Sequence, residues 1–294
     1  MQGLVYLADN MEILSRIPSG ALTCSLIDPP YNSKILQKRK TISVTASEEG
    51  DRVGFQGKRY KTTVVGEKSY LDKFDDLMAF LRPRFEQVKR MLSIQGSSYS
   101  FIDYREEHRL RFLLDEIFGE KNYLNSLVWA YHYGSYKRDR WPQKHDTIYY
   151  YAKQVGDHIF NVDEIERVPY MAPGMVTPEK AARGKIPSDV WFNTISCGSE
   201  RVGYPTQKPL KIVRRMVQAS THKEDTVIDF FAGSGTTGAA ALNLGRKFIL
   251  IDNNPQAFDV MQRRFAGIPG IKFVNSKEEI PMVEADVQEL LNGG

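Results

Sequence analysis

The first residues able to do chemistry are the tetrad Asp28-Pro29-Pro30-Tyr31. The tetrad directly follows the apolar segment 22–27, a predicted strand, so it lies at a strand's carboxyl end, where open α/β sheets bind ligands. Its prolines remove backbone donors and leave acceptor carbonyls. Asp28 and the Pro29 carbonyl would accept the two hydrogens of an exocyclic amino group while Tyr31 stacks on the ring that carries it. Such contacts aim the nitrogen lone pair at an electrophile, as methylation by a sulfonium donor requires; a proline turn capped by an aspartate is the alternative.

The second motif is a glycine-rich loop at residues 229–238, where Gly233, Gly235 and Gly238 satisfy G-x-G-x-x-G. The loop lies between a predicted strand and a helix beginning near Thr237, the context in which this pattern predicts binding of an adenine nucleoside. The next strand ends at Asp252, which is placed to accept hydrogen bonds from both ribose hydroxyls or, alternatively, to cap a helix. No Gly-Lys-Ser/Thr follows, which excludes a Walker loop. The loop alone fits both a nicotinamide dinucleotide and S-adenosylmethionine.

Composition limits the remaining possibilities. The 294 residues are 41% hydrophobic and 26% charged, values typical of one large globular domain and not of a disordered chain or coiled coil. No apolar run approaches the ~20 residues of a membrane span, and the N-terminus has no basic segment of the signal-peptide type. Cys24 and Cys197 cannot form a disulfide framework or a four-ligand zinc site. We therefore expect a reduced, cytoplasmic protein with no structural metal and no membrane segment.

The charge distribution is more informative than the net charge of +4. Residues 34–68 contain nine basic and four acidic side chains, and residues 177–215 contain eight and three. Either cluster alone fits a solvated surface. Together they favour a phosphate-binding face, because lysine and arginine gain affinity for nucleic acid through counterion release.

The elements that must position these motifs follow from hydrophobic patterning. Seven strands are predicted, at 4–8, 22–27, 96–102, 125–130, 147–152, 226–230 and 247–251. Three- and four-residue apolar spacing predicts helices over 72–92 and 105–118, with Gly119 ending the second. The alternation predicts an α/β fold, a seven-stranded, mostly parallel sheet with helices on both faces. Residues 33–70 are predicted to form a long loop, and residues 154–205 are predicted to be irregular because prolines interrupt them.

In this order the motifs resemble the S-adenosylmethionine-dependent DNA amino-methyltransferases of the permuted β group, in which the tetrad comes early and the glycine loop late. The segment containing Asp9 is similar to the family's acidic segment, which implies that this carboxylate lies near the target amine and the cofactor. Tyr204-Pro205-Thr206-Gln207-Lys208-Pro209 resembles the segment before the first cofactor helix. The resemblance implies that Thr206, Gln207 and Lys208 face the methionine part of the cofactor, with Lys208 able to pair with a carboxylate. Lys144-His145-Asp146 resembles the segment beside the base pocket; for His145 alone a satisfied histidine at a strand start is the preferred reading.

The resemblance implies a single Rossmann-like methyltransferase domain over residues 1–294, with the catalytic half first and the cofactor-binding half at 204–276. Residues 33–70 would face DNA as an inserted loop, and residues 131–203 would contain the target-recognition region. The catalytic residues implied are Asp28, Pro29, Pro30 and Tyr31. The cofactor residues implied are Asp9, Thr206, Gln207, Lys208, Asp229, Phe230, Phe231, Ala232, Gly233, Ser234, Gly235, Thr236, Thr237, Asp252 and Asn253. Basic and aromatic residues expected at DNA are Lys38, Arg39, Lys40, Lys137, Arg138, Arg140 and Trp141, in a segment that also fits a half-buried hairpin with a charged face.

The activity implied is transfer of a methyl group from S-adenosylmethionine to N6 of a flipped-out adenine in double-stranded DNA. The aspartate that opens the tetrad favours adenine, and N4 of cytosine is the near alternative. A nicotinamide-dependent dehydrogenase and a DNA-binding protein without catalysis are the alternatives from other classes, and RNA or protein amines stay open as substrates. Cytosine-C5 chemistry is excluded, because it needs a cysteine nucleophile after proline, and Cys24 and Cys197 follow Thr23 and Ser196. The family also suggests a homodimer and a restriction endonuclease partner.

Overall fold

A computed structural model describes residues 1–33, 35–46, 52–53, 59–131, 136–192, 198–275 and 283–292. Its centre is a nine-stranded sheet in the order β12-β1-β11-β10-β2-β6-β8-β7-β9. The strands are β1 (Gly3–Leu7), β2 (Leu22–Ile27), β6 (Leu92–Ile102), β7 (Tyr123–Ala130), β8 (His145–Ala152), β9 (Val190–Phe192), β10 (Thr226–Asp229), β11 (Lys247–Asp252) and β12 (Ile271–Val274). Only β8 runs antiparallel to its neighbours β6 and β7, so the sheet is mostly parallel, as predicted.

All seven predicted strands belong to this sheet, but the predicted number was too small. The two additional strands, β9 and β12, lie at opposite edges of the sheet. Each has only three or four residues, too few for a hydrophobic period to be recognised. Both pair in parallel with a longer strand, β9 with β7 and β12 with β1, so tertiary pairing and not local sequence creates them.

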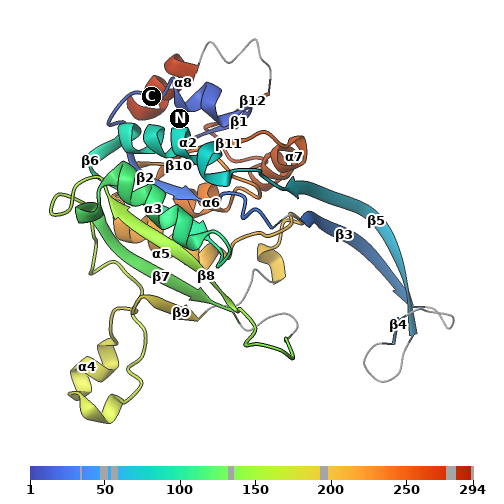
Figure 1. Cartoon of the computed structure of the whole chain (residues 1–294), viewed down its shortest axis with the longest axis horizontal. Helices are drawn as coiled ribbons and strands as arrows, with labels where there is room; N and C mark the ends of the chain where they lie inside the picture. The colour runs from blue at the N-terminus through green and yellow to red at the C-terminus, as the bar shows by residue number, and fades with distance from the viewer. Residues whose placement is uncertain are drawn as a thin grey trace.

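Helices cover both faces of the sheet (Figure 1). Buried residues of α1 (Asn10–Leu14), α2 (Leu77–Met91), α3 (Glu107–Phe118) and α8 (Val283–Asn292) form one hydrophobic cluster. Residues of α5 (Leu210–Ser220), α6 (Thr236–Asn243) and α7 (Pro255–Arg264) form the other. Alternate residues of one strand enter different clusters, Leu4 and Tyr6 the first and Val5 the second, which is the period expected of a sheet buried on both faces. The two predicted helices correspond to α2 and α3, although α2 begins at Leu77 after the cap provided by Asp76.

The centre of the sheet brings the two sequence motifs together. Strands β10 and β2 are parallel neighbours, with Val227 opposite Cys24 and Ile228 opposite Ser25. Parallel strands end at the same edge of a sheet, so the tetrad after β2 and the glycine loop after β10 meet there although about 200 residues separate them. This edge is the topological switch point of the fold.

The prediction of a long loop at 33–70 was wrong. Described residues of this segment form a three-stranded antiparallel sheet of β3 (Ile35–Ala46), β4 (Arg52–Val53) and β5 (Arg59–Asp72), in the order β3-β5-β4. Figure 1 shows this arm extending away from the main sheet. Threonine and serine were read as loop residues, but the runs 41–45 and 62–65 are rich in β-branched threonine, valine and isoleucine, which favour strands.

One buried side chain joins the two ends of the arm. Asn32 follows the tetrad with φ of 52°, in the left-handed region that asparagine tolerates. Its amide nitrogen donates to Glu106 Oε1 at 3.0 Å, and its amide oxygen accepts from the backbone nitrogen of Phe74 at 3.0 Å. The chain therefore leaves the domain and returns to it beside a single amide group.

The segment predicted to be irregular, 154–205, contains few regular elements. It holds α4 (Pro178–Arg183), the edge strand β9 and two short 3-10 helices, η3 (Pro173–Met175) and η4 (Gly198–Glu200); a third, η2 (Glu120–Asn122), precedes β7. The part around α4 projects from the body of the molecule (Figure 1). In the described part of the chain, no helix has the length and apolar character needed to cross a membrane.

Candidate active site

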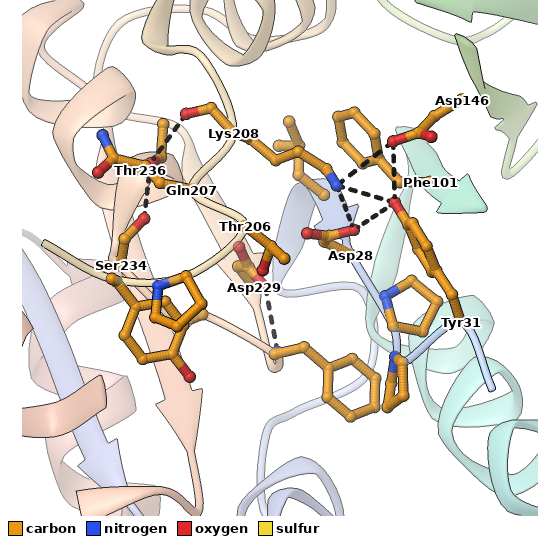
Figure 2. Close-up of a pocket in the computed structure, with 18 of the residues that line it drawn as sticks. Asp28, Tyr31, Phe101, Asp146, Thr206, Gln207, Lys208, Asp229, Ser234 and Thr236 are labelled. Atoms are coloured by element: carbon orange, nitrogen blue, oxygen red, sulfur yellow. Dashed lines mark hydrogen bonds and ion pairs between the residues drawn. The ribbon is translucent and has the colours of Figure 1, made fainter. Parts of the chain in front are cut away.

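A cavity of about 590 Å³ opens at the switch point. All four tetrad residues line it. Twelve of the predicted cofactor residues do so as well: Thr206, Gln207, Lys208, Asp229, Phe231, Ala232, Gly233, Ser234, Thr236, Thr237, Asp252 and Asn253. The tetrad and the glycine loop thus face one continuous space, as Figure 2 shows for the labelled side chains.

The glycine loop is shaped by backbone conformations that other residues avoid. Gly233 and Gly235 have φ of 49° and 72°, in the left-handed region. A Cβ atom on Gly233 would lie 3.0 Å from the Tyr204 ring, and one on Gly238 would lie 2.8 Å from Leu250 Cδ1. These glycines let the backbone turn back on β10 and pack α6 against the sheet, so that the first turn of α6 faces the cavity.

Two buried carboxylates flank this loop. Asp229 accepts hydrogen bonds from Thr237 Oγ1 at 2.7 Å and from the Phe231 backbone nitrogen at 3.1 Å, and burial raises its pKa to about 7. Asp252 accepts from the backbone nitrogens of Gly233 at 2.8 Å and Asn254 at 2.9 Å, and burial raises its pKa to about 6. The backbone bonds to Asp252 fix the glycine loop against the end of β11. Both carboxylates also line the cavity, so they are available to hydroxyl and ammonium donors of a ligand.

Three predicted cofactor residues lie elsewhere. Phe230 is buried in the hydrophobic core, and Gly235 packs beside Met261 and Phe265 behind the loop. Asp9 does not line the cavity: its carboxylate caps α1 by accepting from the Met11 backbone nitrogen at 2.8 Å and lies 3.9 Å from Arg84. A helix begins at the next residue and has the Asp9 carboxylate as its N-cap.

The opposite end of the cavity contains two carboxylates around one ammonium group (Figure 2). The Tyr31 hydroxyl donates to Asp28 Oδ1 at 2.7 Å. Lys208 Nζ lies 3.0 Å from Asp28 Oδ1, 2.8 Å from Tyr31 Oη and 3.6 Å from Asp146 Oδ2. The other Asp146 oxygen accepts from Tyr131 Oη at 3.1 Å. Burial raises the pKa of Asp146, and the nearby Lys208 ammonium opposes that shift.

Aromatic rings enclose this cluster. Lys208 Nζ lies 4.9 Å from the Tyr31 ring centre, 5.1 Å from that of Phe101 and 5.6 Å from that of Trp129. These rings and carboxylates form a pocket with apolar walls and an acceptor-rich floor, which suits a planar ring bearing an amino group.

Sequence reasoning missed several residues of this pocket. Asp146 was noticed only within its segment, with no role assigned, and Phe101, Asp103 and Trp129 were not singled out. Asp103 could have been found from its position, because it directly follows the carboxyl end of β6, the strand that lies beside β2. Asp146 could not be found that way, because β8 runs antiparallel and presents its amino-terminal end to the same edge.

The segment 204–209 turns sharply into the cavity. Thr206 adopts φ of 56°, and the Gln207 side chain accepts from the Val202 backbone nitrogen at 3.0 Å while donating to the Glu200 carbonyl at 2.8 Å. The Gln207 amide therefore stabilises the loop that contains it by hydrogen bonds to the backbone at residues 200 and 202.

The residues expected at DNA fall into two groups. Lys38, Arg39 and Lys40 belong to β3 of the arm. Lys137, Arg138, Arg140 and Trp141 follow β7 and are exposed, Trp141 to 93%. Tyr133 and Cys197 lie outside the described residues, whereas Cys24 is buried in β2 without a reactive setting. The described residues contain no cluster of side chains able to hold a metal ion.

A doubly wound sheet with a glycine loop and an acceptor-rich pocket at its switch point defines a Rossmann-like nucleoside-dependent transferase. The model for a family described as a DNA methylase, the N6 and N4 methyltransferases, matches residues 22–263. The chain therefore belongs to this DNA methylase family, and S-adenosylmethionine is its cofactor. Family membership decides against the nicotinamide-dependent dehydrogenase.

Similar proteins agree with this assignment. The chain is 29% identical over 257 residues to the type II methyltransferase M.HpaI of Haemophilus parainfluenzae, covering 86% of this chain and 71% of that protein. It is 27% identical over 274 residues to the DNA adenine methyltransferase YhdJ of Escherichia coli, covering 87% and 80%. Among solved structures, the cytosine-N4-specific PvuII DNA methyltransferase aligns with a TM-score of 0.63 at 16% identity, covering 100% of this chain and 94% of the other. The M1.HpyAVI complex with S-adenosylmethionine aligns with a TM-score of 0.58 at 19% identity, covering 90% and 99%. These structural likenesses establish the fold.

Proposed function

We propose that the protein is a site-specific methyltransferase acting on N6 of adenine in double-stranded DNA. The observation that carries the proposal is the single cavity that joins the glycine loop to the tetrad, because it brings a nucleoside cofactor and an amine acceptor face to face. Two observations support the choice of adenine: the similar protein YhdJ is named as an adenine methyltransferase, and the tetrad of this chain begins with aspartate.

The cavity residues fit S-adenosylmethionine. The glycine loop turns closely along the cavity at Gly233, Asp252 suits the ribose hydroxyls and Asp229 the amino group of the methionine part. The cofactor supplies an electrophilic methyl group on a sulfonium. Asp28 and the Pro29 carbonyl accept hydrogens of the target amine and orient its lone pair, and Tyr31 packs on the ring. Transfer forms the nitrogen–carbon bond as the sulfur–carbon bond breaks, and the surplus proton of the amine passes to Asp28 or to water.

The test is identification of the product. The protein is incubated with duplex DNA and methyl-labelled S-adenosylmethionine, the DNA is digested, and the labelled nucleoside is identified by mass spectrometry. Label in N6-methyl-2′-deoxyadenosine supports the proposal. Label in N4-methyl-2′-deoxycytidine would mean that the same mechanism acts on cytosine, the base named for the PvuII enzyme, and label in neither nucleoside would contradict both.

The raised pKa of Asp229 predicts a pH dependence of cofactor binding. The carboxyl of the empty protein holds its proton up to a pH of about 7, well above the ordinary value of 3.8, because burial penalises the charge. An ammonium group on the ligand favours the ionised form, so affinity for S-adenosylhomocysteine should rise as pH increases through about 7, with release of a proton. Because the folded protein holds this proton more tightly than the unfolded chain, the free energy of unfolding of the empty protein should fall as pH rises from ~4 to ~7.

Calorimetry in buffers of different ionisation enthalpy measures both the affinity and the proton released. Asp229→Asn keeps the size of the side chain and should flatten the pH profile of binding. A profile with the same slope in wild type and variant would show that Asp229 does not meet the ligand's amino group.

Two parts of the chain are proposed to contact DNA: the arm within residues 33–70 and the region from 131 to 203. Residues 204–276 are proposed to form the cofactor-binding half. The basic residues of β3 support the role of the arm, and the exposed Lys137, Arg138 and Trp141 support the role of the second region.

Replacing Lys38, Arg39 and Lys40 by alanine should weaken DNA binding at all sequences and reduce the slope of log K against log salt by about 2 to 3. Fluorescence anisotropy at several salt concentrations measures this slope, with cofactor binding as the control for folding. An unchanged slope would remove the arm from the DNA interface.

Partners and location complete the proposal. The names of type II methyltransferases among the similar proteins support a restriction endonuclease as functional partner, and the family resemblance supports a homodimer and a place in the cytoplasm, where DNA and cofactor occur together. Sedimentation analysis of the purified protein tests the dimer.

A further inference from the structure

The Lys208 ammonium lies where the proposed reaction needs the target amine. Both are nitrogen donors that must contact Asp28, and the Lys208 Nζ is 3.0 Å from Asp28 Oδ1. The rings of Tyr31, Phe101 and Trp129 surround this nitrogen at 4.9 to 5.6 Å, as they would surround the edge of a base. The sequence had suggested a different partner for Lys208, the carboxylate of the cofactor's methionine part.

Hydrogen-bond capacity makes the two nitrogens compete. A carboxylate oxygen has room for about two strong donors, and Asp28 Oδ1 already accepts a hydrogen bond from Tyr31 Oη at 2.7 Å and forms an ion pair with Lys208 Nζ at 3.0 Å. A base amine that binds this oxygen must replace one of them. Lys208 is the donor that can leave, because its flexible stem carries the ammonium away without moving the tetrad, whereas Tyr31 is fixed three residues from Asp28.

Asp146 offers the displaced ammonium a second partner. Its Oδ2 atom lies 3.6 Å from Lys208 Nζ, and its side chain is only 8% exposed. Tyr131 holds the other oxygen of Asp146, which keeps the carboxylate facing the cluster. A short movement of Lys208 from Asp28 towards Asp146 would preserve its ion pair while opening the amine position, so the buried charge stays compensated.

We propose that Lys208 is a placeholder for the target amine: its ammonium occupies the amine position on Asp28 in the empty enzyme and transfers to Asp146 when the flipped base enters. Lys208 and Asp146 act as positioning residues that keep a cation beside Asp28 in the empty pocket and set how readily the base binds. This inference rests on the proposed function and adds a competition step to it.

The test compares base flipping with cofactor binding. A duplex carries 2-aminopurine next to the target base of the protein's own methylation site, mapped beforehand by sequencing, and its fluorescence rises when the neighbouring target base leaves the stack. Lys208→Met removes the competitor and should raise the flipped fraction about fivefold, whereas Asp146→Asn removes the second partner and should lower it by a similar factor. The flipped fraction of the double variant should equal that of Lys208→Met alone, because without the Lys208 ammonium there is no cation for Asp146 to pair with.

A matched ion pair elsewhere supplies the controls. Lys272 Nζ lies 2.8 Å from Asp286 Oδ1, Asp286 is also 8% exposed, and neither residue lines the cavity. Lys272→Met and Asp286→Asn should leave the flipped fraction unchanged. Calorimetry with S-adenosylhomocysteine completes the set, and the Lys208→Met dissociation constant should stay within about twofold of wild type.

The outcomes separate the possibilities. A tenfold or larger loss of S-adenosylhomocysteine affinity in Lys208→Met, with no gain in flipping, would overturn the placeholder and return Lys208 to the cofactor carboxylate. Additive losses of flipping in the double variant would also overturn it, because they indicate a merely structural role. Wild-type protein that methylates neither adenine nor cytosine would contradict the proposed function itself, whereas wild-type methylation with unchanged flipping in Lys208→Met contradicts only the placeholder.

Discussion

Asp28→Asn should lower the single-turnover methylation rate by about 10²- to 10³-fold, comparable with the loss of a preorganised hydrogen-bond partner in other enzymes. The substitution keeps the shape of the side chain but removes the negative charge and replaces one acceptor oxygen by a donor. The amine then loses both the group that orients its lone pair and one acceptor for its proton. Rapid mixing of enzyme, DNA and labelled cofactor, with product counted over time, measures the rate.

Binding measurements separate this effect from misfolding. Asp28 lies at the amine end of the cavity, so S-adenosylhomocysteine affinity should change by no more than about threefold, in keeping with a residue that acts on the transition state. Asp286→Asn makes the same substitution at a buried aspartate outside the cavity and serves as the control. A variant that keeps more than a tenth of the wild-type rate would show that another group orients the amine, and Asp146 would be the first to examine.

Gly235→Val should reduce the free energy of unfolding by about 2 to 4 kcal/mol and abolish measurable cofactor binding. Gly235 has φ of 72°, and a Cβ atom there would lie 2.9 Å from Met261 Cγ and 3.1 Å from the Phe265 ring. The branched side chain is strained at this φ and can be accommodated only if α6 moves, which displaces the loop that faces the cavity. Urea unfolding and calorimetry with S-adenosylhomocysteine measure the two losses.

Gly245→Val is the matched control. Gly245 has φ of 67°, nearly that of Gly235, but a Cβ atom there would meet only the flexible Lys223 side chain at 3.4 Å. Backbone strain should lower the free energy of unfolding of the control variant by about 1 to 3 kcal/mol, and its cofactor affinity should stay unchanged. Equal effects of the two variants would mean that the packing behind the loop does not determine cofactor binding.

The central fold was predictable because its signals are local and strong. The seven strands that could be read are short runs containing β-branched and aromatic residues, and the helices α2 and α3 repeat apolar residues at helical spacing. The two ligand motifs were also predictable, because each of them is a continuous stretch of sequence that directly follows a strand. Parallel pairing of β10 with β2 then places them at one edge without any further information.

The parts that were not predicted depend on contacts distant in sequence. The arm was mistaken for a loop because its polar residues hide a strand pattern that becomes evident only when β3 and β5 pair. The hydrogen bond by which Asp9 caps α1 was not predicted either. The pairing of Lys208 with Asp28 and Asp146 joins residues from three separate segments, and no sequence spacing encodes that meeting.

Asn32 makes the length of the arm independent of the geometry of the tetrad. Its amide holds Phe74 and Glu106, so the two ends of the arm meet at a fixed separation whatever lies between them. Doubling the length of an insertion closed in this way costs only about 0.6 kcal/mol of loop entropy. The length and charge of the arm can therefore change without moving the tetrad at the catalytic edge.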